Sequence, residues 1–194
     1  MKRSLSSAAL ALVAALTLTN CGNGDSSGAG DGDFNEADVT FAQLMIPHHE
    51  QAVEMAKMAK RHASTPEVKN LADKIEAAQG PEIATMKGWL KEWGKDESSD
   101  DSMGGMDHGS DDSGDMDMPG MMSDADMAAL DKATGAEFDR MFLTMMIEHH
   151  TGAIEMAKTE QSRGKNADAK ALAKKIEADQ TSEIAEMNKM LNSL

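Results

Sequence analysis

Residues 41–62 read FAQLMIPHHEQAVEMAKMAKRH, and residues 142–163 read FLTMMIEHHTGAIEMAKTEQSR. The two stretches align without a gap at an offset of 101 residues, and the match continues through a further helix-length segment. Apolar residues recur at steps of three and four in both copies, which predicts amphipathic helices. Each copy keeps two adjacent histidines beside methionines, His48-His49 in the first and His149-His150 in the second. The chain is therefore an internal duplication that repeats the same potential metal ligands.

The duplicated unit predicts an all-α protein. Each copy gives two helices joined by a short turn, at about 35–62 and 66–93 in the first copy and about 124–163 and 167–192 in the second. An isolated antiparallel pair cannot bury both of its apolar faces. The two hairpins are therefore expected to pack as a four-helix bundle, as in ferritin-like proteins. The long connection between the copies equally allows a hairpin to pair with that of a second molecule in a homo-oligomer.

The segments outside the repeats divide the chain further. Residues 1–20 carry two basic residues and then a short apolar run, which is typical of a signal peptide. Cys21 follows, is the only cysteine, and stands where a bacterial lipoprotein signal places its lipid attachment site. Residues 21–33 then form a flexible tether, residues 34–93 the first repeat and residues 124–194 the second. This order predicts an extracytoplasmic protein held to the bacterial membrane by its lipid, on the cell surface or the periplasmic side.

Between the repeats, residues 94–123 lose the apolar period and are rich in Asp, Ser, Gly and Met, which predicts a disordered acidic linker. Methionine has no core to fill in such a segment, so its abundance indicates metal capture. The candidate ligands here are Met103, Met106, His108, Met116, Met118, Met121 and Met122. The segment resembles the methionine-rich stretches of extracytoplasmic copper-handling proteins. Compositional drift without a function is the alternative interpretation.

The charge balance narrows the range of partners. The chain has 34 acidic and 19 basic residues, a formal net charge of −15 at pH 7. This argues against binding to nucleic acid and to anionic lipid surfaces, so the lipid anchor is the only membrane contact expected. The same charge favours the approach of cations.

Several of the 18 methionines are placed to assist the histidine pairs. Residues three, four or seven positions apart share a face of a helix. The methionines that share a face with the pairs are Met45 and Met55 in the first copy and Met145, Met146 and Met156 in the second. Imidazole and thioether together favour Cu(I) and Ag(I), and Cu(II) is a further candidate. Because a ligating imidazole must be neutral, binding by histidine is expected to weaken below about pH 6.5.

Two motifs give the chain a family resemblance. Met-Ile-Pro-His-His is followed by Ala-Val-Glu-Met-Ala and later by Gln-x-x-Glu-Ile-x-x-Met-x-x-Trp-Leu, ending at Leu90. The second copy repeats the pattern with Met190 in place of Trp89. The chain thus resembles the "domain of unknown function 305" family over both repeats. The resemblance implies a ferritin-like helical bundle in a secreted or envelope protein, and some members of the family are associated with copper binding and tolerance.

Three functions follow from these features. The first is a membrane-tethered protein that binds Cu(I) or Ag(I) and buffers it or hands it to a copper-handling partner, with no catalytic residue. The second is a structural or interaction module in which the histidine pairs serve packing. The third is a di-iron oxidase, which needs Glu-x-x-His motifs that the predicted helices lack.

Overall fold

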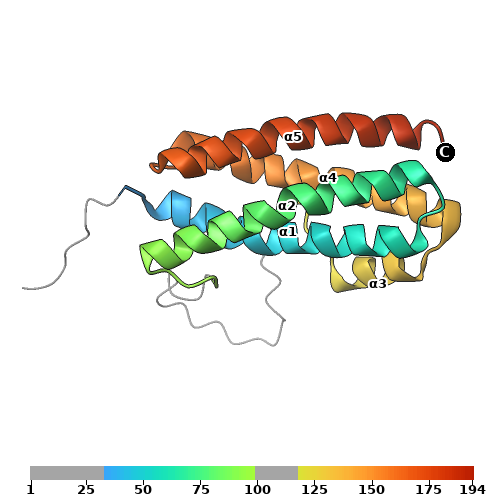
Figure 1. Cartoon of the computed structure of the whole chain (residues 1–194), viewed down its shortest axis with the longest axis horizontal. Helices are drawn as coiled ribbons and strands as arrows, with labels where there is room; N and C mark the ends of the chain where they lie inside the picture. Colours follow the sequence, from blue (N-terminus) through green and yellow to red (C-terminus); the bar gives the residue numbers. More distant parts are fainter. Residues whose placement is uncertain (1–32, 99–117) are drawn as a thin grey trace, which may run out of the picture. The chain divides into compact units, whose positions relative to one another are not determined.

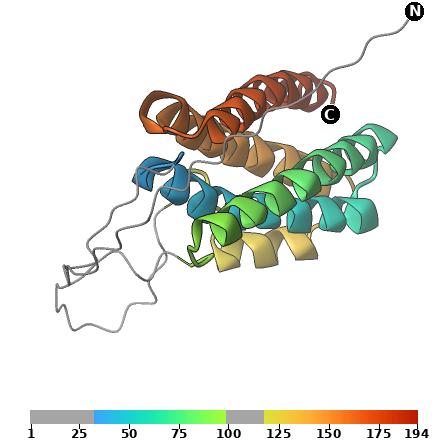
Figure 2. The same ribbon diagram turned by 60° about the vertical axis from the view of Figure 1, so that its left-hand side comes forward.

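The computed structural model describes residues 33–98 and 118–194, which form five α-helices. These are α1 (Glu36–His62), α2 (Pro66–Trp93), α3 (Asp124–Lys132), α4 (Gly135–Arg163) and α5 (Ala167–Leu191) (Figure 1). The prediction of an all-α protein is confirmed. Helix α1 packs along α2, α4 packs along α5, and α1 contacts α4 at the centre. The short α3 lies beside α1 in both views (Figures 1 and 2).

Local sequence signals account for the helix ends. The Asn35 side chain accepts hydrogen bonds from the first turn of α1, and the Asp38 carboxylate accepts one from the Asn35 amide, which completes a capping box. Thr65 caps α2 ahead of Pro66, whose missing N–H has no helical partner to lose at that position. Gly94 ends α2 with φ +65°, a left-handed conformation that favours glycine. Helix α1 continues through the internal Pro47.

The helix predicted over 124–163 is interrupted in the structure. Helix α3 ends at Lys132, and α4 begins at Gly135, which has φ +66°. The backbone of Gly135 forms an isolated bridge with Ala63, in the turn between α1 and α2. The long apolar period continues across this break, so the sequence pattern alone did not reveal it.

The predicted linker is shorter at its second end than the sequence suggested. Residues 118–123 belong to the described structure and make specific contacts, so the prediction of disorder is wrong for them. The Met122 amide donates to the Gln51 side chain, which in turn donates to the Met122 carbonyl. Outside the described residues lie the signal peptide, Cys21, most of the tether, and the linker residues Met103, Met106, His108 and Met116.

Two buried aspartates tie the hairpins together in a reciprocal way. Asp38, at the start of α1, accepts hydrogen bonds from the amides of Lys165 and Asn166, in the turn between α4 and α5. Asp139, at the start of α4, accepts from the Ser64 amide and hydroxyl and from the Thr65 amide, in the turn between α1 and α2. Each aspartate is fully buried, and the two stand at the repeat offset. Each hairpin therefore caps the turn of the other.

The interior consists of two apolar clusters with a polar layer between them. One cluster includes residues from 52 to 75 of the first repeat, and the other includes residues from 39 to 46 and Met86 and Leu90. Both clusters also take side chains from the second repeat. On each of the four long helices, buried polar residues separate the part that belongs to one cluster from the part that belongs to the other. These residues are His48, His49, Gln79, Glu82, His149, His150 and Gln180. A polar layer inside a bundle is costly unless its groups find partners.

No helix in residues 33–98 or 118–194 is both long and apolar enough to cross a bilayer.

Candidate metal centre

Four imidazoles meet in the polar layer, two from α1 and two from α4. All four are fully buried. The ring centroids of His48 and His149 lie 3.7 Å apart with 41° between the ring planes, and those of His149 and His150 lie 6.4 Å apart. The two histidine pairs therefore form one cluster, a point that the sequence left open. Ala52 and Ala153, each three residues after its histidine pair, are also fully buried.

Three of the four rings are held through the same nitrogen. His49 Nε2 lies 3.0 Å from Glu82 Oε2, and His150 Nε2 lies 2.6 Å from Glu183 Oε2. His48 Nε2 lies 3.1 Å from the carbonyl oxygen of Pro119. Since carboxylates and carbonyls accept, these rings donate through Nε2 and keep a lone pair on Nδ1. Histidines that ligate metals are commonly fixed in this way, with the second nitrogen bonded to a carboxylate or carbonyl.

The nitrogens that remain have no partner among the described residues. Nδ1 of all four histidines is buried and unpaired, and His149 has no partner at Nε2 either. Buried polar atoms are hydrogen-bonded in the great majority of cases, so five unpaired nitrogens in one cluster need an explanation. One turn before the two glutamates, Gln79 and Gln180 also bury unpaired amide atoms. A bound ion would give these unpaired nitrogens the partner that they lack among the described residues.

Burial favours the neutral form, which metal binding requires, at His48, His49 and His149. Desolvation, helped by repulsion from His49, lowers the pKa of His48 to about 3. Desolvation also lowers the pKa of His49, against the opposing effect of the Glu82 hydrogen bond and charge. The pKa of His149 is well below its usual value because of desolvation and the neighbouring imidazoles.

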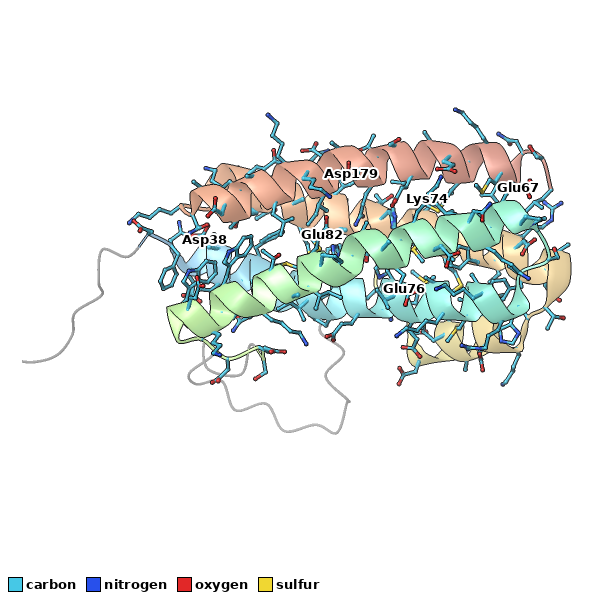
Figure 3. The ribbon with its side chains drawn as sticks, viewed as in Figure 1. Asp38, Glu67, Lys74, Glu76, Glu82 and Asp179 are labelled. Atoms are coloured by element: carbon cyan, nitrogen blue, oxygen red, sulfur yellow. The ribbon has the colours of Figure 1, made fainter. Side chains whose placement is uncertain are left out.

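Glu82 has a charged neighbour that its repeat counterpart lacks. Burial opposes its ionisation, but hydrogen bonds from His49 and Lys175 outweigh burial and lower its pKa. The ammonium of Lys175 on α5 lies 2.9 Å from a carboxyl oxygen of Glu82 and 2.8 Å from one of Asp179. Figure 3 labels these two acidic residues. The equivalent lysine of the first repeat, Lys74, pairs instead with Glu186. The two histidine–glutamate pairs are therefore electrostatically unequal.

The methionines predicted as ligands on the helices are all buried, and they divide between the two apolar clusters. Met55, Met145 and Met146 belong to one cluster, and Met45 and Met156 to the other. The layer of histidines thus has thioether side chains on both sides. From the linker, Met122 is buried in the first cluster, whereas Met118 and Met121 are half-buried. No group of three His, Cys, Asp or Glu side chains in the described ranges is arranged to hold a metal as it stands. Binding would need thioether ligands or ring rotation.

Sequence reasoning missed three residues of this centre: Glu82, Glu183 and Pro119. Both glutamates lie 33 residues after the histidine they contact, and both fall within the matched part of the repeat. That recurrence was a usable signal, because a polar residue repeated on an inner helix face requires a buried partner. Pro119 had no such signal, since it lies in the segment between the repeats.

The comparisons with known proteins identify the family and the fold. The model of the family "Domain of unknown function (DUF305)" matches residues 38–191, so the chain belongs to this family. A comparison with curated protein sequences finds no match.

Solved structures of three relatives share the fold. A DUF305 protein of Streptomyces coelicolor, designated as secreted, is 35% identical with a TM-score of 0.72, covering 81% of this chain and 93% of its own. A DUF305 fragment from Deinococcus radiodurans is 28% identical with a TM-score of 0.70, covering 82% and 98%. CopM in its Cu(II)-bound form is 33% identical with a TM-score of 0.65, covering 80% and 96%. CopM structures with Cu(I) and with silver match as well.

Proposed function

We propose that this protein binds Cu(I) at the histidine layer between α1 and α4. The observation that carries the proposal is a set of four buried histidine Nδ1 atoms that have no partner in the part of the chain that the structure describes. Three of these histidines are anchored through Nε2. His48, His49, His149 and His150 are the nitrogen ligands, and the neighbouring thioethers of Met45, Met55, Met145, Met146 and Met156 complete the coordination. This ligand chemistry suits Cu(I) and Ag(I), and the similarity to copper- and silver-bound CopM supports it.

A purely structural role for the histidine layer is less well supported. Histidines that serve packing are expected to have their ring nitrogens satisfied, since an unpaired buried polar group costs about 1–3 kcal/mol. Here the unpaired atoms gather on facing side chains of two helices.

The wider proposal is sequestration or trafficking of copper outside the cytoplasm. The chain is tethered through Cys21, and the thioethers of residues 103–122, with His108, capture metal near the bundle and pass it to a copper-handling partner. The acidic net charge of −15 supports cation capture.

The direct test is a competition titration of the mature full chain with Cu(I) against a chromogenic chelator. We expect at least one tightly bound Cu(I) per bundle, and loss of that site when all four histidines are replaced by leucine. The matched control replaces Met86 and Met187, which are core residues of equivalent position in the two repeats, by leucine and should leave the site intact. Tight binding that survives removal of the four histidines and of the linker methionines would rule the proposal out.

The burial of the cluster changes the expected pH dependence. A ligand pKa of 6.5 would weaken binding below about pH 6.5, but the pKa of His48 is about 3 and those of His49 and His149 are also lowered. Protons therefore compete with the metal only in much stronger acid. We expect the Cu(I) affinity of the folded protein to be almost the same at pH 7 and pH 5, measured with a chelator calibrated at each pH. A tenfold loss at pH 5 with helical structure intact would contradict the buried site.

A further inference from the structure

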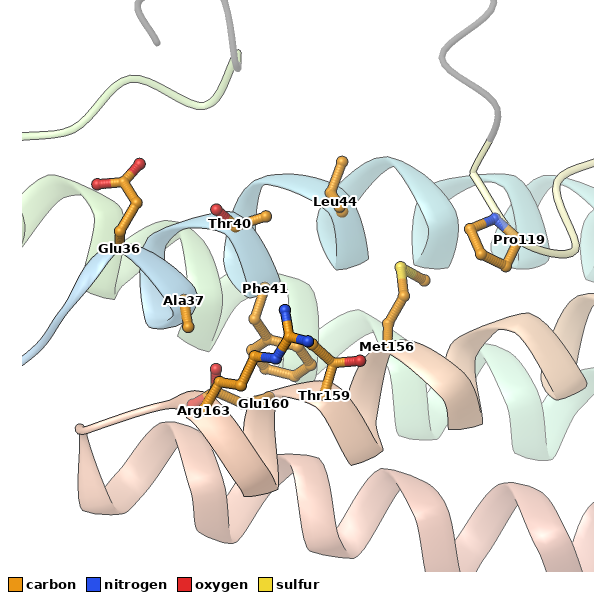
Figure 4. Close-up of a pocket in the computed structure, with 10 residues that line it drawn as sticks. All are labelled: Glu36, Ala37, Thr40, Phe41, Leu44, Pro119, Met156, Thr159, Glu160 and Arg163. Carbon is orange, nitrogen blue, oxygen red and sulfur yellow. The ribbon is translucent and has the colours of Figure 1, made fainter.

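A groove leads from the surface toward the histidine layer. It lies between the first half of α1 and the second half of α4 and has a volume of about 410 Å³ (Figure 4). Phe41, Leu44 and Met156 form its apolar walls, and Glu160 and Arg163 lie toward one end. Pro119 lies at the other end. The carbonyl oxygen of this same Pro119 accepts the hydrogen bond from His48, so Pro119 contacts both the groove and one of the imidazoles.

One face of α4 carries a continuous set of residues along this path. Glu160, Met156, Gly152 and His149 follow one another at steps of four, four and three, which keeps them on one side of the helix. Glu160 is 1% exposed, and burial, a hydrogen bond with Asp38 and the charge of Asp38 raise its pKa to about 8, so its carboxyl group is neutral at pH 7. Met156 lies on this face between Glu160 and Gly152. Beyond the neutral carboxyl group, this face offers a cation a sulfur and then nitrogen.

The segment 118–122, which we call the plug segment, closes the inner end. The Pro119 carbonyl sits against Gly152, where any Cβ would overlap it. Gly120, at φ +78°, lies against the backbone of Glu148 and His149 with no room for a side chain. Two hydrogen bonds between Gln51 and the Met122 backbone, of 2.8 and 2.9 Å, hold the segment to α1. Positions 51 and 152 are equivalent in the two repeats, but one is glutamine and the other is glycine. The plug segment uses both: Gln51 binds its backbone, and Gly152 leaves room for it.

We propose that the metal ion reaches the buried imidazoles through this groove, passing the Met156 thioether, and that the plug segment controls its exchange. This inference rests on the proposed function and adds its access route. Release of the Pro119 carbonyl from His48 opens the groove to the imidazoles. The plug also contains three methionines of the methionine-rich segment, Met118, Met121 and Met122.

The test measures Cu(I) transfer from a chromogenic chelator to the full mature chain by stopped flow, together with the affinity at equilibrium. Thr40 is exposed and lines the groove, so Thr40→Trp should slow loading about tenfold without changing the affinity. Thr144, exposed on α4 away from the groove, gives the control Thr144→Trp. Gln51→Ala removes two hydrogen bonds from the plug and should speed both loading and release roughly tenfold. Its control is Gln43→Ala, which likewise removes two bonds from a side chain to a backbone segment.

The outcomes separate the route from the site. Thr40→Trp loading at the wild-type rate would overturn the groove as the path. Gln51→Ala exchanging metal no faster, although the Met122 amide exchanges its hydrogen faster, would overturn the plug. Both results leave the copper site itself in place, because the affinity is measured separately. A wild-type protein that binds no Cu(I) at equilibrium would refute the proposed function and the route together.

Discussion

His149→Leu should stabilise the metal-free protein and impair its metal site at the same time. His149 is fully buried, and neither of its ring nitrogens has a hydrogen-bond partner within residues 33–98 and 118–194. Leucine has a similar volume and no polar atom, so the substitution removes an unmet hydrogen-bonding requirement worth about 1–3 kcal/mol. Losing one nitrogen ligand should lower the Cu(I) affinity at least about tenfold. In other metalloproteins, loss of a residue that only hydrogen-bonds a ligand already costs about 10- to 100-fold in affinity. Urea unfolding with and without Cu(I) measures both effects.

The control for this prediction is His62→Leu. His62 is also a helical histidine, at the end of α1. Unlike His149 it is partly exposed, and its Nε2 lies 3.4 Å from a carboxyl oxygen of Asp131. It should change neither the metal affinity nor the free energy of unfolding by more than about 1 kcal/mol. If His149→Leu destabilised the metal-free protein by several kcal/mol, the ring would have a packing role that outweighs its unpaired nitrogens. That result would favour the structural interpretation of the histidine layer.

Asp139→Ala is expected to be the most destabilising single substitution outside the apolar clusters. The Asp139 carboxylate is fully buried and accepts three hydrogen bonds from Ser64 and Thr65. Alanine leaves these donors without an acceptor at the junction of the two hairpins. The loss should be on the order of 3 kcal/mol or more, which lowers Tm by roughly 6–12 °C in a domain of this size.

Asp131→Ala provides the comparison, because it removes an exposed aspartate that pairs with Arg61 at 3.1 Å. Such a surface pair contributes at most about 1 kcal/mol. Thermal unfolding followed by circular dichroism compares the two variants. Equal Tm values for Asp139→Ala and the wild type would show that the reciprocal caps do not hold the hairpins together.

Repetition made much of the molecule predictable. Helix type and the ends of α1 and α2 followed from the apolar period and from Asn35, Thr65 and Gly94, since these signals act within a few residues. The sequence left open whether the two histidine pairs meet, because their meeting depends on how α1 packs against α4. The break before Gly135 could not be predicted in this way, as it depends on a backbone contact with the distant Ala63.

The same distinction applies to the site. The sequence indicated histidine and methionine as ligands, but the roles of Glu82 and Glu183 depend on how α2 and α5 face α1 and α4. The order in residues 118–122 depends on Gln51 and on the space left by Gly152, two positions that have no local signal for binding a loop. Tertiary contacts decided these features, and no periodicity encodes them.

The reciprocal aspartates have a consequence for the origin of the protein. Each aspartate accepts hydrogen bonds from the turn of the other hairpin. Asp38 of the first repeat accepts from the turn between α4 and α5, and Asp139 of the second repeat accepts from the turn between α1 and α2. A single-repeat ancestor with this geometry would satisfy both turns only in a twofold-symmetric dimer, where equal patches serve each other. Such a dimer would lose its caps, and its central histidine layer, on dilution. Covalent joining of the two copies replaces that dependence on protein concentration with a fixed effective concentration, and it releases each copy to diverge, as positions 51 and 152 have done.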